Sequence, residues 1–145
     1  MFVDIYALAV TSVAVLVIAF AFIKGDDPER IAAGTYALVA LAGAIIPKDV
    51  GSSGPLWGLM GLDIVQLLVF VGLALHTRRA WPVWASAFQA LVVTGHLLMV
   101  FNLQSHTNAF VAFAAMNNVA NYALLIALAV GTFWAWQERR AAGLK

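Results

Sequence analysis

The chain has 145 residues, of which 63% are hydrophobic and 10% are charged, and its mean hydropathy is +0.92. Soluble domains carry about 25% charged residues, so the composition argues against a soluble protein and predicts one integral membrane domain, residues 1–145. A net charge of +1 without a basic stripe argues against nucleic acid as a partner. The absence of cysteine excludes thiol catalysis, iron–sulfur clusters and disulfides.

A hydrophobic run needs about 20 residues to cross the hydrocarbon layer of a bilayer as a helix. The sequence contains five such runs, at about residues 4–23, 28–46, 56–76, 81–102 and 108–136. In "KGDDPER" between the first two, Gly25 is expected to end one helix, Asp27 to cap the next and Pro28 to occupy its first turn. The predicted fold is therefore an all-α bundle of five transmembrane helices.

The distribution of basic residues predicts the orientation of these helices. Asp4 stands where a secretory signal has basic residues, so the first run is expected to be retained as a helix. Lys48 is the only basic residue expected on one side of the membrane. The other side receives seven, namely Lys24, Arg30, Arg78, Arg79, Arg139, Arg140 and Lys145. By the positive-inside rule the N-terminus lies outside and the C-terminus in the cytoplasm, as in a multi-pass protein of the inner membrane.

Asp63 is the acidic residue that this topology places within the membrane. It lies ~10 Å below the outer end of its helix, where a carboxylate costs several kcal/mol unless a partner meets it. His96 on the next, antiparallel helix lies at ~9 Å, so we predict direct contact between Asp63 and His96. Other polar residues at overlapping depths are expected to complete a buried cluster. They are Gln66, Gln89, Asn117, Asn118 and Asn121.

Such a cluster has two interpretations that the sequence leaves open. Polar side chains commonly join membrane helices, each contributing about 0.6 kcal/mol on average. An aspartate, however, is a costly choice for this role, and the same residues could bind a ligand or ion, or respond to protons. Asp63 could also meet a side chain of a partner protein.

Three histidines in a membrane bundle raise the question of b-type haem, whose iron is held by axial imidazoles in many proteins. His76 is expected at the cytoplasmic face, ~20 Å from His96, and His106 in an outer loop. No pair is placed to hold a haem, and Asp63 with His96 supplies only two of the four ligands that structural zinc needs. No catalytic motif is visible. The prediction is a non-enzymatic protein without cofactor or metal.

Small residues crowd the second run, at Gly34, Ala37, Ala40, Gly43 and Ala44. Small residues allow membrane helices to approach closely, so this helix is predicted to contact neighbouring helices or other chains. The leading hypothesis is an accessory or structural subunit of a larger membrane complex, or a homo-oligomer. A small carrier, or a ligand-binding or proton-binding protein that uses Asp63 and His96, is the alternative, and an electron-transfer or quinone-site subunit is the third.

Overall fold

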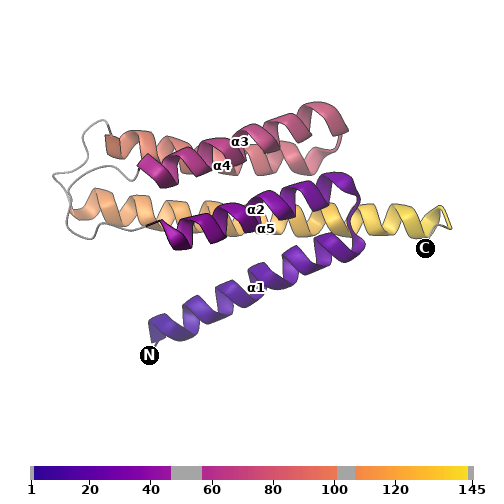
Figure 1. Ribbon diagram of the computed structural model, residues 1–145, viewed down its shortest axis with the longest axis horizontal. Helices are drawn as coiled ribbons and strands as arrows, with labels where there is room; N and C mark the ends of the chain where they lie inside the picture. Colours follow the sequence, from indigo (N-terminus) through magenta and orange to yellow (C-terminus); the bar gives the residue numbers. More distant parts are fainter. Residues whose placement is uncertain (1, 47–56, 101–106, 144–145) are drawn as a thin grey trace.

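The computed structural model describes residues 2–46, 57–100 and 107–143, and all regular structure in these residues is α-helical (Figure 1). The helices in chain order are α1 (Phe2–Lys24), α2 (Asp27–Ile45), α3 (Trp57–Thr77), α4 (Ala80–Val100) and α5 (Thr107–Ala141). Each predicted range overlaps one helix. The largest difference is at the end of α5, which continues to Ala141 instead of ending at residue 136. The expected all-helical bundle is therefore confirmed.

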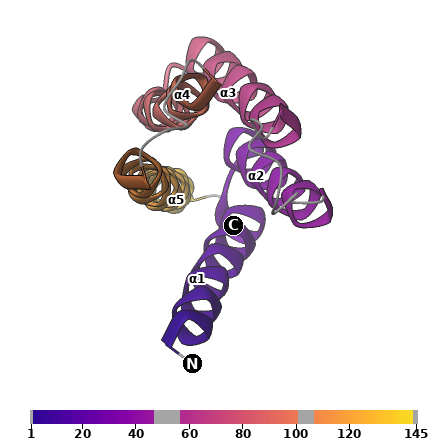
Figure 2. The ribbon, with the colours of Figure 1, turned by 90° about the vertical axis from the view of Figure 1, so that its left-hand side faces the viewer.

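The helices run alternately in opposite directions, so the α1–α2 and α3–α4 turns lie at the same end of the bundle (Figure 1). Helix α4 packs against α3 and α5, while α2 packs against α1 and α3 and, less extensively, α5. Viewed along the bundle, α1 lies outside the group formed by α2 to α5 (Figure 2). We call the end that carries the two turns the turn end.

The α1–α2 turn depends on a glycine and on a reciprocal cap. A Cβ atom on Gly25 would lie 2.4 Å from the carbonyl oxygen of Ala21 and 2.6 Å from Cβ of Glu29. The cap of α2 is Asp26, so the prediction of Asp27 was wrong by one residue. The reason is that Glu29, three residues after Asp26, accepts a 3.0 Å hydrogen bond from the backbone N–H of Asp26, as in a capping box.

The α3–α4 turn has two residues between Thr77 and Ala80, against the four that the predicted helix ranges leave. Arg78 adopts a φ of 52° there, in the left-handed region that non-glycine residues visit mostly as single turn residues. This conformation reverses the chain and leaves Arg79 beside the start of α4.

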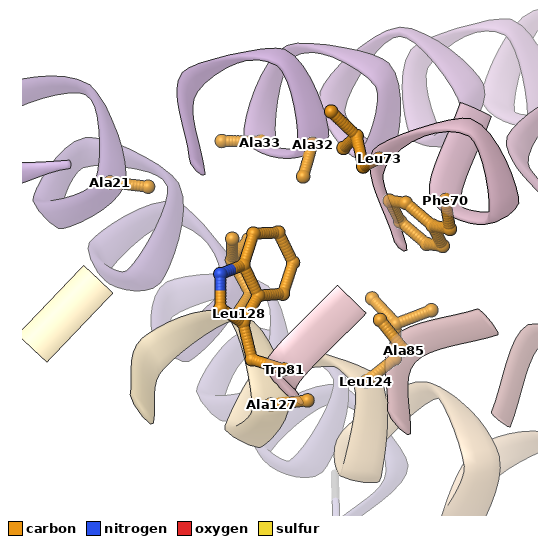
Figure 3. Packing of buried hydrophobic residues seen from close by; sticks show 10 residues of the cluster. All are labelled: Ala21, Ala32, Ala33, Phe70, Leu73, Trp81, Ala85, Leu124, Ala127 and Leu128. Atoms are coloured by element: carbon orange, nitrogen blue, oxygen red, sulfur yellow. The ribbon is translucent and has the colours of Figure 1, made fainter. Parts of the chain in front are cut away.

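The core cluster combines large and small side chains and lies toward the turn end of the bundle (Figure 3). Phe70, Trp81, Leu124 and Leu128 are nearly completely buried. Alanines surround them, and the buried ones in this cluster are Ala21, Ala32, Ala33, Ala85 and Ala127. Small residues bring helix backbones close together, because packing rather than water exclusion holds helices together in lipid.

Two helical segments, Trp57–Thr77 and Ala115–Ala141, are long and apolar enough to cross a membrane among the residues the structure describes. Only 17% of the most apolar window of the first is buried, whereas the core helix of a soluble protein would be mostly buried. This exposure points to membrane association. Five spans are not shown by this criterion, and the described apolar part of α1, Leu8–Lys24, is shorter than a span. Helices α2 and α4 carry polar residues that are buried inside the bundle, including Glu29 in α2 and Gln89 and His96 in α4.

Candidate functional site

Asp63, Gln66, Gln89 and His96 form a hydrogen-bonded group between α3 and α4, which we call the Asp63 network. His96 Nε2 lies 2.9 Å from Asp63 Oδ2, so the predicted contact between the two residues is present. Gln89 Nε2 donates to the other carboxylate oxygen of Asp63 at 2.9 Å and to its backbone oxygen at 3.2 Å. Gln66 Nε2 donates in turn to Gln89 Oε1 at 3.2 Å.

The side chains of this network are buried to different degrees. Gln89 is completely buried and Gln66 nearly so, while the side chain of Asp63 keeps 19% of its exposure. Both carboxylate oxygens nevertheless have a protein partner. The partners that these bonds give the two oxygens are a histidine ring and a glutamine amide.

The three asparagines of α5 do not join the Asp63 network in the part of the chain that the structure describes. Asn118 is exposed. Asn121 donates to the backbone oxygen of Asn117 at 2.9 Å, within its own helix. The side-chain oxygen of Asn117 is buried and has no hydrogen-bond partner among the described residues. The predicted seven-residue set is therefore four residues plus a separate polar stretch on α5.

A second polar group lies at the turn end, and we call Asp26, Glu29, Arg79 and Trp81 the Glu29 network. The side chain of Glu29 is completely buried. Its Oε1 accepts hydrogen bonds from Arg79 Nη1 and Trp81 Nε1, both at 2.7 Å. Arg79 Nη2 also pairs with Asp26 Oδ2 at 2.7 Å. These bonds hold the start of α2 against the α3–α4 turn and the first residues of α4.

Arg79 is a fixed cation in this setting. Burial opposes its charged form, but the hydrogen bonds and the negative charges of Asp26 and Glu29 outweigh that effect and raise the pKa of the guanidinium. Helix α5 adds two contacts from its C-terminal part. Arg139 Nε lies 3.3 Å from Asp26 Oδ1, and Glu138 lies 3.8 Å from Arg79.

Reasoning from the sequence missed the Glu29 network. The sequence predicts only a capping role for the acidic residues of this turn, and capping is only part of what Asp26 and Glu29 do. One signal was available, because the spacing of Asp26 and Glu29 fits a capping box. Nothing local could have identified Arg79 as the partner, since 50 residues separate it from Glu29.

The predicted small-residue set on α2 divides between helix contacts and open surface. A Cβ atom on Gly34 would lie 3.6 Å from the Phe22 ring of α1, and one on Gly43 would lie 3.4 Å from Leu59 of α3. Ala40 and Ala44 are exposed, and Ala37 is partly buried. Helix α2 thus contacts two neighbours through glycines and leaves alanines on an open surface.

Of the three histidines weighed for haem binding, the structure describes His76 and His96. His76 is exposed at the end of α3, while His106, like Lys48, falls outside the described residues. Within the described ranges, no group of three or more His, Cys, Asp or Glu side chains could hold a metal ion. No protein family, curated protein sequence or solved structure matches this chain.

Proposed function

We propose that this chain is a multi-pass protein of the inner membrane in which all five helices cross the bilayer, with the N-terminus outside and the C-terminus in the cytoplasm. The support is that the turn end gathers six basic residues, and cytoplasmic ends of membrane proteins are rich in such residues. They are Lys24, Arg30, Arg78, Arg79, Arg139 and Arg140. A reporter that is active only outside the cytoplasm, fused after Lys145, should be silent. An active reporter would invert the proposed topology.

Within this topology, the chain acts as a non-enzymatic subunit of a membrane assembly, either a hetero-complex or a homo-oligomer. The observation that carries this proposal is the position of α1 outside the rest of the bundle (Figure 2). Among the α1 side chains that the structure describes, Ala21 alone is buried, and Leu8 and Leu16 are 73% and 68% exposed.

A helix in this position can pack against a helix of another chain. Helix association in lipid depends on van der Waals packing between close surfaces, and α1 meets its own bundle mainly near the turn end (Figure 1). The exposed Ala40 and Ala44 of α2, four residues apart, provide a second surface on which a helix can approach closely.

Photo-crosslinking in native membranes tests the subunit role. Benzoylphenylalanine in place of Leu8 on α1 should give a defined crosslinked product, of twice the chain mass for a second copy or of another mass for a different subunit. The matched control places it at Val65, an exposed apolar residue at a similar distance from the start of α3. A product at neither position, or equal products at both, would contradict a specific role of α1.

The Asp63 network favours a second function, a small carrier or a ligand-binding or proton-binding protein. The specific observation is the 2.9 Å contact between Asp63 and His96, an acid and a titratable base in a mostly buried setting. This alternative predicts that Asp63→Asn abolishes transport or ligand binding and leaves assembly intact. The subunit role predicts that the same change lowers stability modestly, and bulky replacements of Ala37 or Ala40 disturb association.

A further inference from the structure

A pocket of about 670 Å³ opens at the turn end, between the end of α1, the first turns of α2 and the C-terminal part of α5. Four cationic side chains line it, namely Lys24, Arg30, Arg139 and Arg140. None of them belongs to the Asp63 network or to the Glu29 network, although Arg139 pairs with Asp26, a member of the Glu29 network. The pocket therefore has a concentration of positive charge that the proposed function leaves unexplained.

Among the described residues, only one of these four cations is paired with a carboxylate. Arg139 forms an ion pair with Asp26 and also donates to the backbone oxygen of Lys24, while Arg30 donates to the backbone oxygen of Phe22 at 3.2 Å. Lys24, Arg30 and Arg140 form no ion pair with a carboxylate of the described residues. The other nearby acid, Glu138, lies within ion-pair distance of Arg79 instead. An anion entering the pocket would meet three cations without a carboxylate partner.

The pocket also has an apolar wall. The Trp136 ring lines it, with edge-on contacts to Phe20 at 6.5 Å and to Phe133 at 5.9 Å that hold the ring in place. Arg140 lies over this ring, 5.0 Å from its centre. Ile23, which is 67% exposed, completes the apolar side. A ligand suited to both walls has a negatively charged group joined to an apolar part.

We propose that this pocket binds the phosphate of an anionic phospholipid headgroup, with the glycerol and upper acyl chains against Trp136 and Ile23. Arginine and lysine side chains bind phosphate through charge-assisted hydrogen bonds. Basic pockets between helices on the cytoplasmic side are typical sites for such headgroups. The inference rests on the membrane location and orientation given under the proposed function, but not on the subunit role.

Native mass spectrometry of the full chain in a zwitterionic detergent tests the pocket. With equal amounts of phosphatidylglycerol and phosphatidylcholine, the wild-type chain should retain mainly phosphatidylglycerol. Each cation near a membrane surface contributes about 1 kcal/mol, so the double variant Lys24→Gln/Arg30→Gln should bind about 30-fold more weakly. The charge-conserving variant Lys24→Arg/Arg30→Lys should keep most of the affinity. Its retained binding would show that the Gln double variant loses affinity because it loses charge, and not because it is misfolded.

Arg78→Gln is the matched control, because Arg78 is an exposed cation at the same end that does not line the pocket. Its phosphatidylglycerol binding should stay close to that of the wild type. Equal weakening by Arg78→Gln and Arg30→Gln, or equal retention of phosphatidylcholine, would overturn the proposal. Displacement of the lipid by millimolar inorganic phosphate would assign the pocket to a free anion instead. Binding in detergent does not depend on orientation, so a reversed topology and a failed pocket give different results.

Discussion

Glu29 and Asp63 are both acids in an apolar bundle, but they differ in burial and in the side chains that they contact. Glu29 is completely buried and is paired with Arg79, a cation at any physiological pH. Asp63 is less buried, and its partners are a glutamine amide and a histidine. The Glu29 network therefore contains a carboxylate–guanidinium ion pair, whereas the Asp63 network joins a carboxylate to a histidine and an amide.

The two networks also differ in how much of the fold they connect. The Glu29 network joins α2 to the α3–α4 turn and α4, and Asp26 extends it to α5 through Arg139. The bonds of the Asp63 network within the described residues join α3 to α4, two helices already linked by a two-residue turn. Loss of the first should therefore disturb the bundle, whereas loss of the second should disturb one hairpin.

The largest expected effect is from Glu29→Ala, compared with Asp63→Ala. Removal of Glu29 leaves Arg79 and the indole N–H of Trp81 without their shared acceptor, and breaking a buried ion pair costs about 3 kcal/mol. Interhelical polar contacts in membranes are weaker, so Asp63→Ala should cost about 1 kcal/mol. The free energy of unfolding, measured by titration with a denaturing detergent, gives both values.

Asp27→Ala serves as the control for Glu29→Ala, since Asp27 is an exposed acid in the same turn. Its effect on the free energy of unfolding should be close to zero. If Asp63→Ala destabilises the chain as much as Glu29→Ala, the ranking of the two networks is wrong.

Gly131→Ala tests the packing that supports the Glu29 network. A Cβ atom at Gly131 would lie 2.4 Å from the Trp81 ring, so the ring must move away from its position beside Glu29. Such overpacking costs about 1–3 kcal/mol. Gly72→Ala is the matched control, because no atom lies within 4 Å of its added Cβ. Thermal unfolding should distinguish the two variants, and similar midpoints would contradict the close packing of α4 on α5.

Gln89→Leu should have a smaller effect, confined to the Asp63 network. The change removes the donor to Asp63 Oδ1 and the acceptor for Gln66, at a cost of about 1–2 kcal/mol. Thr94→Val is a suitable control, since the exposed Thr94 bonds only to a carbonyl of its own helix. The same denaturing titration measures both variants. An unchanged stability of Gln89→Leu would mean that the network contributes nothing to the pairing of α3 and α4.

The contrast between the two networks also shows how far sequence reasoning reached. Helix ranges followed from the lengths of hydrophobic runs, and the contact of Asp63 with His96 followed from matched depths on two helices joined by a short turn. Depth was insufficient for α5, because Asn118 lies at a similar predicted height but on an exposed face. Height follows from the rise per residue, whereas the direction of a side chain depends on how each helix is rotated in the bundle.

The Glu29 network could not be predicted for a related reason. Its main partners are about 50 residues apart and become neighbours only because α2 packs beside α3, the helix that leads into Arg79 and Trp81. Hydropathy and charge counting treat Arg79 as one more cytoplasmic cation, and the topology based on that count requires no partner for it. Which basic residue neutralises which acid is decided by helix packing.

The smallest expected effect is from Arg139→Gln, at the edge of the Glu29 network. The 3.3 Å pair with Asp26 joins two side chains that are 27% and 29% exposed, and exposed pairs contribute about 0.2–1 kcal/mol. A double-mutant cycle of Arg139→Gln with Asp26→Asn should therefore give a coupling energy below about 1 kcal/mol that falls further at high salt. The cycle of Arg79→Gln with Glu29→Gln should give a larger coupling with little salt dependence, because Glu29 is completely buried. Couplings of equal size would mean that the buried pair of Glu29 with Arg79 contributes no more to the turn end than the exposed pair of Asp26 with Arg139.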